Sequence, residues 1–181
     1  MFNRVVALFQ RNGWNFHPVE GQTVLETGFE AHHSKVPLHV QVFEDRDALS
    51  VVGRSSTTVQ TDRIDRAAEL LMRANLSLTV GAFELDCDQG AVLFRATNLF
   101  PKSAEIDEIL TSLVQATVVE TDTMTAFLSE LNQLPLPVSS DQIVELLQRG
   151  DLMPDISPHL DAGNDAKSSE SAESTRISEQ K

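Results

Sequence analysis

The feature of the sequence that most constrains its fold is a strict alternation of apolar and other residues over 36–43. Four aliphatic residues occupy every second position, and they are Val36, Leu38, Val40 and Val42. Successive side chains of a β-strand point to opposite faces of the sheet, so this spacing predicts a half-buried strand. Similar alternation over 24–30 and 49–53, with short connections at 31–35 and 44–47, predicts a three-stranded antiparallel meander.

Apolar residues with helical spacing occur in three places outside the meander. They predict a short helix that Asn3 caps, a second helix over 64–72 and a long helix that Ser103 caps. Glu105, Asp107 and Glu108 follow Ser103 within the first turn, where negative charge interacts favourably with the helix dipole. The β-branched residues within 117–121 predict a kink or an interruption of the long helix.

Two further strands complete the expected fold. Residues 78–86 and 91–97 lie on either side of Asp88-Gln89-Gly90, and an acidic side chain followed by a glycine is typical of a tight hairpin turn. The expected order of elements is then α-β-β-β-α-β-β-α. The sequence therefore predicts an α+β fold in which helices cover an antiparallel sheet, with Phe83 in the core.

The composition divides the chain into three expected parts. Residues 1–133 hold the predicted α+β domain. Residues 134–150 comprise a stiff proline linker and a short amphipathic helix, which begins with a capping box of Ser139 and Gln142. Residues 151–181 contain seven acidic residues and many serines but few large apolar side chains, so they predict a disordered tail.

The charge and the single cysteine limit the kinds of partner and compartment. Lys and Arg number 14 against 27 Asp and Glu, which gives a formal net charge of −13. Such a surface repels nucleic acids and anionic membranes, so neither is expected as a partner. The apolar runs are far shorter than the roughly 20 residues that cross a bilayer, and none makes a persuasive secretory signal. Together with Cys87, which fits a reducing compartment, these features predict a cytoplasmic protein.

The sequence shows no motif typical of a catalytic, cofactor or metal site. His32, His33 and His39 form the one histidine cluster, but adjacent residues of an extended chain point in opposite directions. Cys87 is flanked by two aspartates, whose negative potential opposes thiolate formation. The segment 86–97 lacks the chelating glutamate of an EF-hand. We therefore expect no catalytic residue, no metal and no cofactor.

Three motifs follow one another over residues 66–92. They are Arg73-Ala74-Asn75 at a helix end, Gly81-Ala82-Phe83-Glu84-Leu85-Asp86 in a strand and Asp88-Gln89-Gly90 in a turn. This succession resembles the bacterial YbjN-domain family, and the resemblance extends over residues 1–133. It implies a fold like that of type III secretion chaperones, a tendency to dimerise and a role in regulating sensory transduction. It implies no catalytic residues.

Apolar residues without an evident place in the core are the remaining functional signal. On the outer face of the meander, Phe43 and Val52 lie among polar residues. They fit either ordinary exposed residues or a surface that receives another chain. Ile143 and Leu147 lie four residues apart on the short helix, and they fit either docking on their own domain or binding to a partner.

We therefore expect a non-enzymatic protein-binding module, chaperone-like or regulatory, that forms a homodimer. Its expected contacts with a protein partner are Phe43, Val52, Ile143 and Leu147. Two alternatives stay open: an enzyme whose site is assembled from residues distant in the sequence, and a stress or sensory regulator that acts through an unknown partner. A deep pocket with convergent titratable groups would favour the enzyme, whereas a shallow apolar groove would favour the binding module.

Overall fold

A computed structural model of the chain describes residues 1–100 and 106–153. Within these residues the helices are α1 (Phe2–Arg11), α2 (Ile64–Asn75), α3 (Asp107–Gln133) and α4 (Ser140–Leu147). The strands are β1 (His17–Pro18), β2 (Val24–Glu30), β3 (Lys35–Phe43), β4 (Ala48–Arg54), β5 (Ala82–Asp86) and β6 (Ala91–Leu99). Three short 3-10 helices are η1 (Glu44–Arg46), η2 (Thr61–Arg63) and η3 (Gly150–Leu152).

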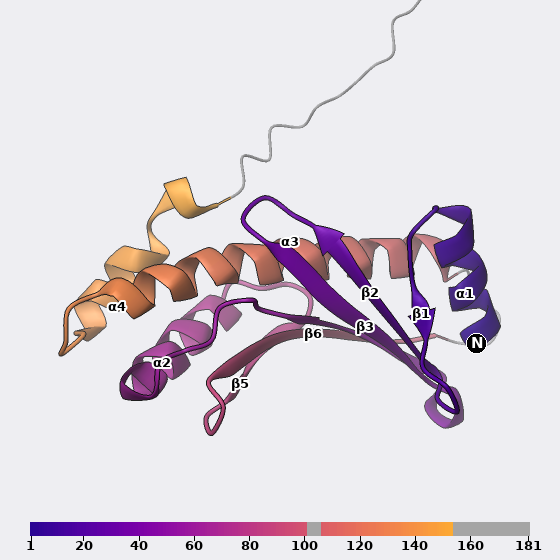
Figure 1. Cartoon of the computed structure of the whole chain (residues 1–181), viewed down its shortest axis with the longest axis horizontal. Coiled ribbons are helices and arrows are strands. Elements are labelled where there is room, and N and C mark those ends of the chain that lie inside the picture. The colour runs from indigo at the N-terminus through magenta and orange to yellow at the C-terminus, as the bar shows by residue number, and fades with distance from the viewer. Residues whose placement is uncertain (101–105, 154–181) are drawn as a thin grey trace, which may run out of the picture.

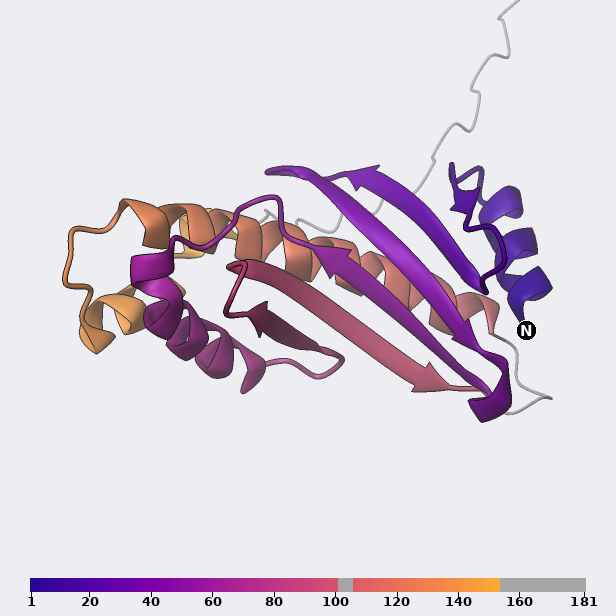
Figure 2. The same cartoon turned by 60° about the horizontal axis from the view of Figure 1, so that its bottom comes forward.

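The strands form one sheet in the order β1-β2-β3-β4-β6-β5, and all neighbours are antiparallel. α3 runs across one face of the sheet, with α1 at one end of the molecule and α2 and α4 at the other (Figure 1). The opposite face of β2, β3, β4 and β6 carries no described helix (Figure 2). The predicted α+β class with helices over an antiparallel sheet is therefore confirmed.

The alternation in β3 decides which face of the sheet is buried. Val36, Leu38, Val40 and Val42 are all buried, and the register places Val40 between Leu25 of β2 and Val51 of β4. These residues share one core with the apolar stripe of α3, which includes Leu110, Val114 and Leu128. The predicted meander and its facing are confirmed.

α3 passes close to β4 at Gly53, where no room is left for a side chain. A Cβ atom at this position would overlap Oγ1 of Thr121 and lie 3.0 Å from Cγ2 of Thr117. Both threonines are buried on the side of α3 that faces the sheet. The β-branched residues thus pack against a glycine, and α3 continues without a break over 107–133. The predicted kink or interruption is wrong.

The beginnings of two helices differ from the prediction. α1 begins at Phe2 after Met1, so Asn3 lies inside the helix and does not cap it. The amino group of Met1 and the N–H of Phe2 instead donate to the carboxylate of Glu44, over 2.9–3.0 Å and 2.9 Å. α3 begins at Asp107, and the predicted cap Ser103 lies outside the described residues.

The C-terminal helix belongs to the main core. Ile143 and Leu146 of α4 are buried in the same cluster as residues of α2 and α3. The predicted capping box is present, because Ser139 Oγ accepts from the Gln142 N–H over 3.2 Å and Gln142 Oε1 accepts from the Ser139 N–H over 2.9 Å. η3 also places Leu152 in this core, so ordered structure extends beyond residue 150. The rest of the predicted tail, 154–181, lies outside the described residues. None of the described helices has the length and apolar character that a bilayer crossing requires.

Candidate functional site: a groove along α3

The helix-free face of the sheet is polar where a partner-binding surface was predicted. Val52 is only 1% exposed, because it lies between His39 of β3 and Arg95 of β6, whose longer side chains flank it. Burial, and secondarily Arg95, lowers the pKa of His39, and Arg95 forms a bidentate ion pair with Glu84 at 2.7 Å and 3.0 Å. Phe43 is partly exposed at the end of β3. The predicted partner contact at Val52 does not fit its burial, whereas the contact at Phe43 stays a prediction.

The two predicted residues of α4 also differ in exposure, as Val52 and Phe43 do. Ile143 is 0% exposed, so it docks on its own domain, and this burial does not fit the predicted contact with a partner. Leu147 is partly exposed and packs at the edge of the core. It lines a pocket beside α3.

This first pocket lies where α2, β5, α3 and α4 meet. It has a volume of about 260 Å³, and its apolar wall includes Leu78, Phe83, Met124, Phe127 and Leu147. Arg73 and Glu120 are its charged members. A second pocket of about 650 Å³ follows along α3 and is lined by Val80, Thr97, Ile109, Leu113 and Ala116, among others.

The two pockets lie along the same helix, and we call them together the α3 groove. Most residues of α3 that line them form a single stripe at helical spacing, and these are Ile109, Leu113, Ala116, Glu120, Met124 and Phe127. Glu108, Ser112 and Thr123 lie beside this stripe. The segment 77–81 separates the pockets, since Ser77 and Leu78 line the first pocket while Thr79, Val80 and Gly81 line the second. Exposed apolar side chains on its lining and on the neighbouring turn of α2 are Met72, Leu76, Val80, Ile109 and Met153.

The edge of the sheet is closed at the first pocket. The side-chain amide of Asn75, the last residue of α2, bonds both backbone groups of Phe83 in β5. The Phe83 N–H donates to Asn75 Oδ1 over 2.8 Å, and Asn75 Nδ2 donates to the Phe83 carbonyl over 3.2 Å. The amide thus takes the place of a neighbouring strand and blocks pairing with another chain at this residue.

At the second pocket no described strand borders the edge of the sheet. β5 begins at Ala82, which pairs with Arg95, whereas β6 continues to Leu99. No described strand therefore pairs with this edge of β6 over 96–99. Thr97 lies at this edge and lines the second pocket. An uncovered edge next to apolar side chains can pair with an extended segment of another chain.

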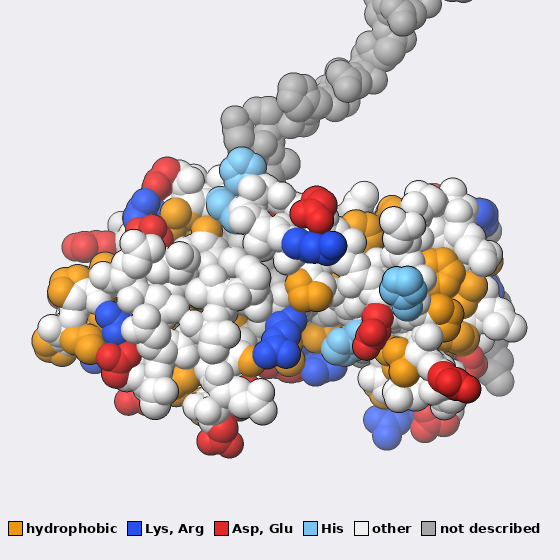
Figure 3. All heavy atoms as spheres, viewed as in Figure 1, with side chains coloured by type: hydrophobic (Ala, Val, Ile, Leu, Met, Phe, Trp, Pro, Cys, Tyr) orange, Lys and Arg blue, Asp and Glu red, His pale blue; other side chains and the backbone are white. Residues whose placement is uncertain are grey.

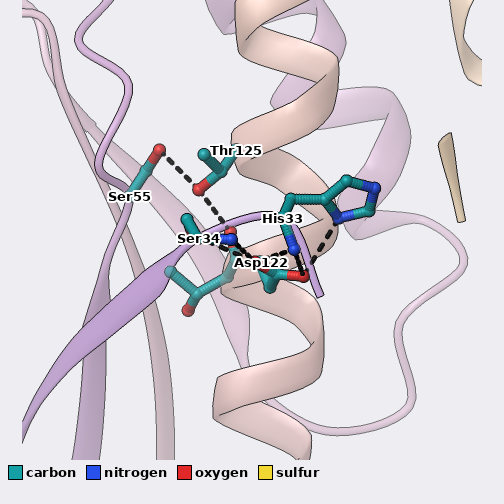
Figure 4. A network of polar contacts seen from close by, with 6 residues as sticks. His33, Ser34, Ser55, Asp122 and Thr125 are labelled. Carbon is teal, nitrogen blue, oxygen red and sulfur yellow. Dashed lines mark hydrogen bonds and ion pairs between the residues drawn. The ribbon is translucent and has the colours of Figure 1, made fainter. Parts of the chain in front are cut away.

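A separate cluster of polar side chains lies on the other side of α3 (Figure 4). The side chain of Asp122 is 2% exposed and accepts hydrogen bonds from the backbone N–H groups of His33 and Ser34, at 2.8–3.1 Å. It also contacts His33 Nδ1 and Ser34 Oγ, each at 3.0 Å. Burial raises the pKa of Asp122, but these hydrogen bonds outweigh that effect and hold the pKa below its usual value. On the next turn, the Thr125 hydroxyl lies 3.0 Å from that of Ser55.

The Asp122 cluster contains part of a catalytic arrangement. A carboxylate bonded to Nδ1 is how many histidine bases are oriented. Here, however, Ser34 bonds the same carboxylate as His33, and the two pockets of the α3 groove include neither residue. The contact between nucleophile and base that acyl transfer needs is therefore missing from this cluster. We interpret it as a latch that fixes the loop between β2 and β3 to α3.

The histidine loop differs in one respect from the prediction. The rings of His32 and His33 lie 4.5 Å apart and perpendicular to each other. The expectation that they point in opposite directions is wrong, because they lie in a turn between two strands. No group of three or more potential metal ligands occurs within residues 1–100 and 106–153. Cys87 is exposed in the turn between β5 and β6.

Apolar side chains are not spread evenly over the surface. On the face drawn in Figure 3 they form small groups, at both ends of the molecule and near its middle, and charged side chains lie among them. One of the two ends carries α2 and α4, the helices that border the first pocket (Figure 1).

No protein-family model matches the sequence, and no curated protein matches it. Among solved structures, the chain is similar to the crystal structure of YbjN from E. coli, described as "a putative transcription regulator". The similarity has a TM-score of 0.54 and a sequence identity of 12%, and it covers 76% of this chain and 96% of YbjN. The chain has a YbjN-like fold. At this identity the likeness concerns the fold alone.

The YbjN-like fold gives a physical role to one motif of the sequence. The Arg-Ala-Asn motif at the end of α2 places Asn75 beside the strand that carries Phe83, and the resulting pair of hydrogen bonds joins helix to sheet edge. The predicted position of Asn75 at the end of a helix is confirmed.

Sequence reasoning missed the two carboxylates of central α3. A signal for Glu120 was present, because it interrupts the otherwise apolar spacing of Ala116, Met124 and Phe127. No comparable signal marked Asp122, whose partners lie 88 and 89 residues away in the sequence.

Proposed function

We propose that this chain is a protein-binding module without enzymatic activity, and that its partner occupies the α3 groove. The observation that carries the proposal is the groove itself, in which two pockets lie along α3 and apolar side chains such as Val80 and Ile109 are exposed. Buried apolar anchors supply most of the binding energy of protein interfaces. The YbjN-like fold supports a binding or regulatory role.

The chemistry of the groove also favours binding over catalysis. The charged side chains that line the two pockets are Arg73 and Glu120 in the first and Glu108 in the second. Arg73 is already paired with Glu69, at 2.9 Å. The lining of the groove thus offers no pair of facing acid and base that could transfer a proton.

The open edge of β6 favours an extended partner segment. A strand that pairs with residues 96–99 would satisfy backbone groups at this edge and place alternate side chains over the second pocket. Its apolar side chains would then contact Ile109 and Val80, which are 40% and 46% exposed.

Peptide selection on the immobilised full-length chain tests this proposal. A random peptide display library should enrich peptides with alternating apolar residues on the wild-type chain, and Ile109→Asp should abolish the enrichment. Val119→Asp is the matched control, because Val119 lies on the same helix, is 39% exposed and lines neither pocket. Equal enrichment on the Ile109→Asp chain, or no enrichment on the wild-type chain, would overturn the proposal.

A further inference from the structure

We infer that the first pocket of the α3 groove receives a basic side chain, lysine or arginine, of the bound partner, and that Glu120 is its counter-ion. The inference rests on the proposed function, since it assigns a chemistry to one part of the same groove. Its basis is a carboxylate that lines an apolar pocket and has no partner in the described structure.

Glu120 differs from the other charged member of the pocket in having no partner. Within the described residues, Glu120 makes no hydrogen bond and no ion pair. Arg73 lines the same pocket but is held by Glu69, through Nε at 3.0 Å and Nη2 at 2.9 Å. The guanidinium of Arg73 is therefore engaged elsewhere, and the carboxylate of Glu120 is left for an incoming cation.

The half-buried position of Glu120 makes this lack of a partner costly. Loss of hydration raises the pKa of Glu120, because burial disfavours the ionised form. A carboxylate that is partly removed from water gains from a hydrogen-bonded cation more than an exposed one does. A ligand that supplies the cation would thus offset a penalty that the free protein carries.

The walls of the pocket fit the rest of a basic side chain. Lysine and arginine bury their methylene stems along apolar surface while the charged head reaches a polar group. The stem would lie among Leu78, Met124 and Leu147, and the rings of Phe83 and Phe127 also line the pocket. Aromatic rings attract cations through their faces. The pocket volume of about 260 Å³ has room for a single side chain of this kind and leaves none for a folded domain.

A side chain of a peptide fits the site better than a free amine does. The two pockets lie on either side of the segment 77–81 along the same helix, so an extended segment is expected to contact both. The net charge of −13 also attracts basic segments at long range. We therefore expect a partner segment in which a lysine or arginine lies next to the apolar residues that enter the second pocket.

Selection on three versions of the full-length chain tests the inference. They are the wild type, Glu120→Gln and the control Glu145→Gln, which removes the same charge from an exposed position of α4 that lines neither pocket. Peptides with a basic residue beside apolar residues should be enriched on the wild type and on the control. On Glu120→Gln, apolar peptides should still be enriched, without the basic preference. Replacement of the basic residue by norleucine in the best peptide should weaken binding to the wild type about fivefold and leave binding to Glu120→Gln unchanged.

The possible outcomes separate this inference from the proposed function. Apolar enrichment without basic preference on the wild type would overturn the inference and leave the binding groove standing. A basic preference that persists on Glu120→Gln would also overturn it, because overall charge would then be the cause. No enrichment on the wild type would overturn the proposed function itself. If Glu120→Gln folds but selects nothing, the norleucine peptide decides on the wild type: a fivefold loss supports the inference and an unchanged affinity overturns it.

Discussion

Two carboxylates on α3, Glu120 and Asp122, lie two residues apart and have opposite environments. They point about 160° apart around the helix axis. Asp122 faces the loop between β2 and β3, where hydrogen bonds from His33 and Ser34 satisfy it and lower its pKa against the effect of burial. Glu120 faces the groove, where burial raises its pKa and no described residue bonds to it. The carboxylate of Asp122 is thus satisfied within the chain, whereas that of Glu120 has no partner among the described residues.

The edge of the sheet repeats this contrast. At Phe83 both backbone groups are bonded by Asn75, while β6 continues past the start of β5 without a partner strand among the described residues. Natural proteins protect edges that must not pair with other chains. An edge left open next to exposed apolar residues fits a surface that has a partner.

The largest effect on stability should come from removing the ring of Phe83, which lines the first pocket and also belongs to the core. Phe83 is 8% exposed and packs edge-on against Phe94, with ring centroids 5.0 Å apart. Phe83→Ala should lower the free energy of unfolding by about 3–5 kcal/mol, because it removes a buried aromatic ring and leaves a cavity. Denaturant unfolding measures this change. A loss below about 1 kcal/mol would show that Phe83 does not hold the core together.

Removing the hydrogen bonds of the Asp122 carboxylate should have the next largest effect on stability. Asp122→Asn should cost roughly 2–3 kcal/mol at neutral pH, since an amide cannot accept all the hydrogen bonds that the buried carboxylate accepts. The pKa of Asp122 is lower in the folded protein than in the unfolded chain, so its contribution is complete above the unfolded value. It is lost as the pH falls through the folded value. Unfolding measured across acidic pH should therefore show wild type and variant converging, and a constant difference would contradict this account.

Neutralising Glu120 should stabilise the protein, in contrast to Asp122→Asn, and by a smaller amount. The pKa of Glu120 is raised in the folded protein, so its ionised form lowers stability once the pH exceeds the pKa of the unfolded chain. Glu120→Gln should raise the melting temperature by about 1–3 °C at neutral pH and give no gain in acid. Thermal unfolding of the wild type, Glu120→Gln and Glu145→Gln measures this difference. Destabilisation by Glu120→Gln at neutral pH would mean that Glu120 has a structural role.

Removal of the C-terminal segment should have the smallest effect. Residues 154–181 are acidic and rich in serine, and their composition cannot bury much apolar surface. A chain that ends at Met153 keeps Leu152 in the core and should melt within a few degrees of the full chain. A larger fall in thermal unfolding would show that the segment contributes to folding.

Local patterns predicted the parts of the fold that depend on neighbouring residues. The alternation of β3 determined its facing, and Asp86 begins the predicted hairpin turn by accepting from the N–H groups of Asp88 and Gln89, each at 3.0 Å. Gly90 has a φ of 67° in that turn, and a Cβ there would overlap the carbonyl of Val59. Such signals lie within a few residues of one another, so the sequence displays them directly.

Contacts between distant segments were not predictable in the same way. The threonines of central α3 indicate a weak helix when they are considered alone, and only the proximity of Gly53 reveals why the helix is continuous. Val52 was expected on the surface, but the side chains of His39 and Arg95 flank it and bury it. These two residues come from the neighbouring strands β3 and β6, so the sequence around Val52 does not show them. The α3 groove is likewise assembled from α2, β5, β6, α3 and α4, and the sequence pointed to just one of its residues, Leu147, as a site.

The most direct test of the account is a methyl NMR titration of the full-length chain with the peptide that the selection enriches most. The binding groove predicts chemical-shift changes at Leu78, Ile109, Met124 and Leu147, with little change at Val24 and Leu49 of the sheet. Changes confined to β2, β3 and β4 would place the peptide on the helix-free face of the sheet around Phe43 and would contradict the central claim.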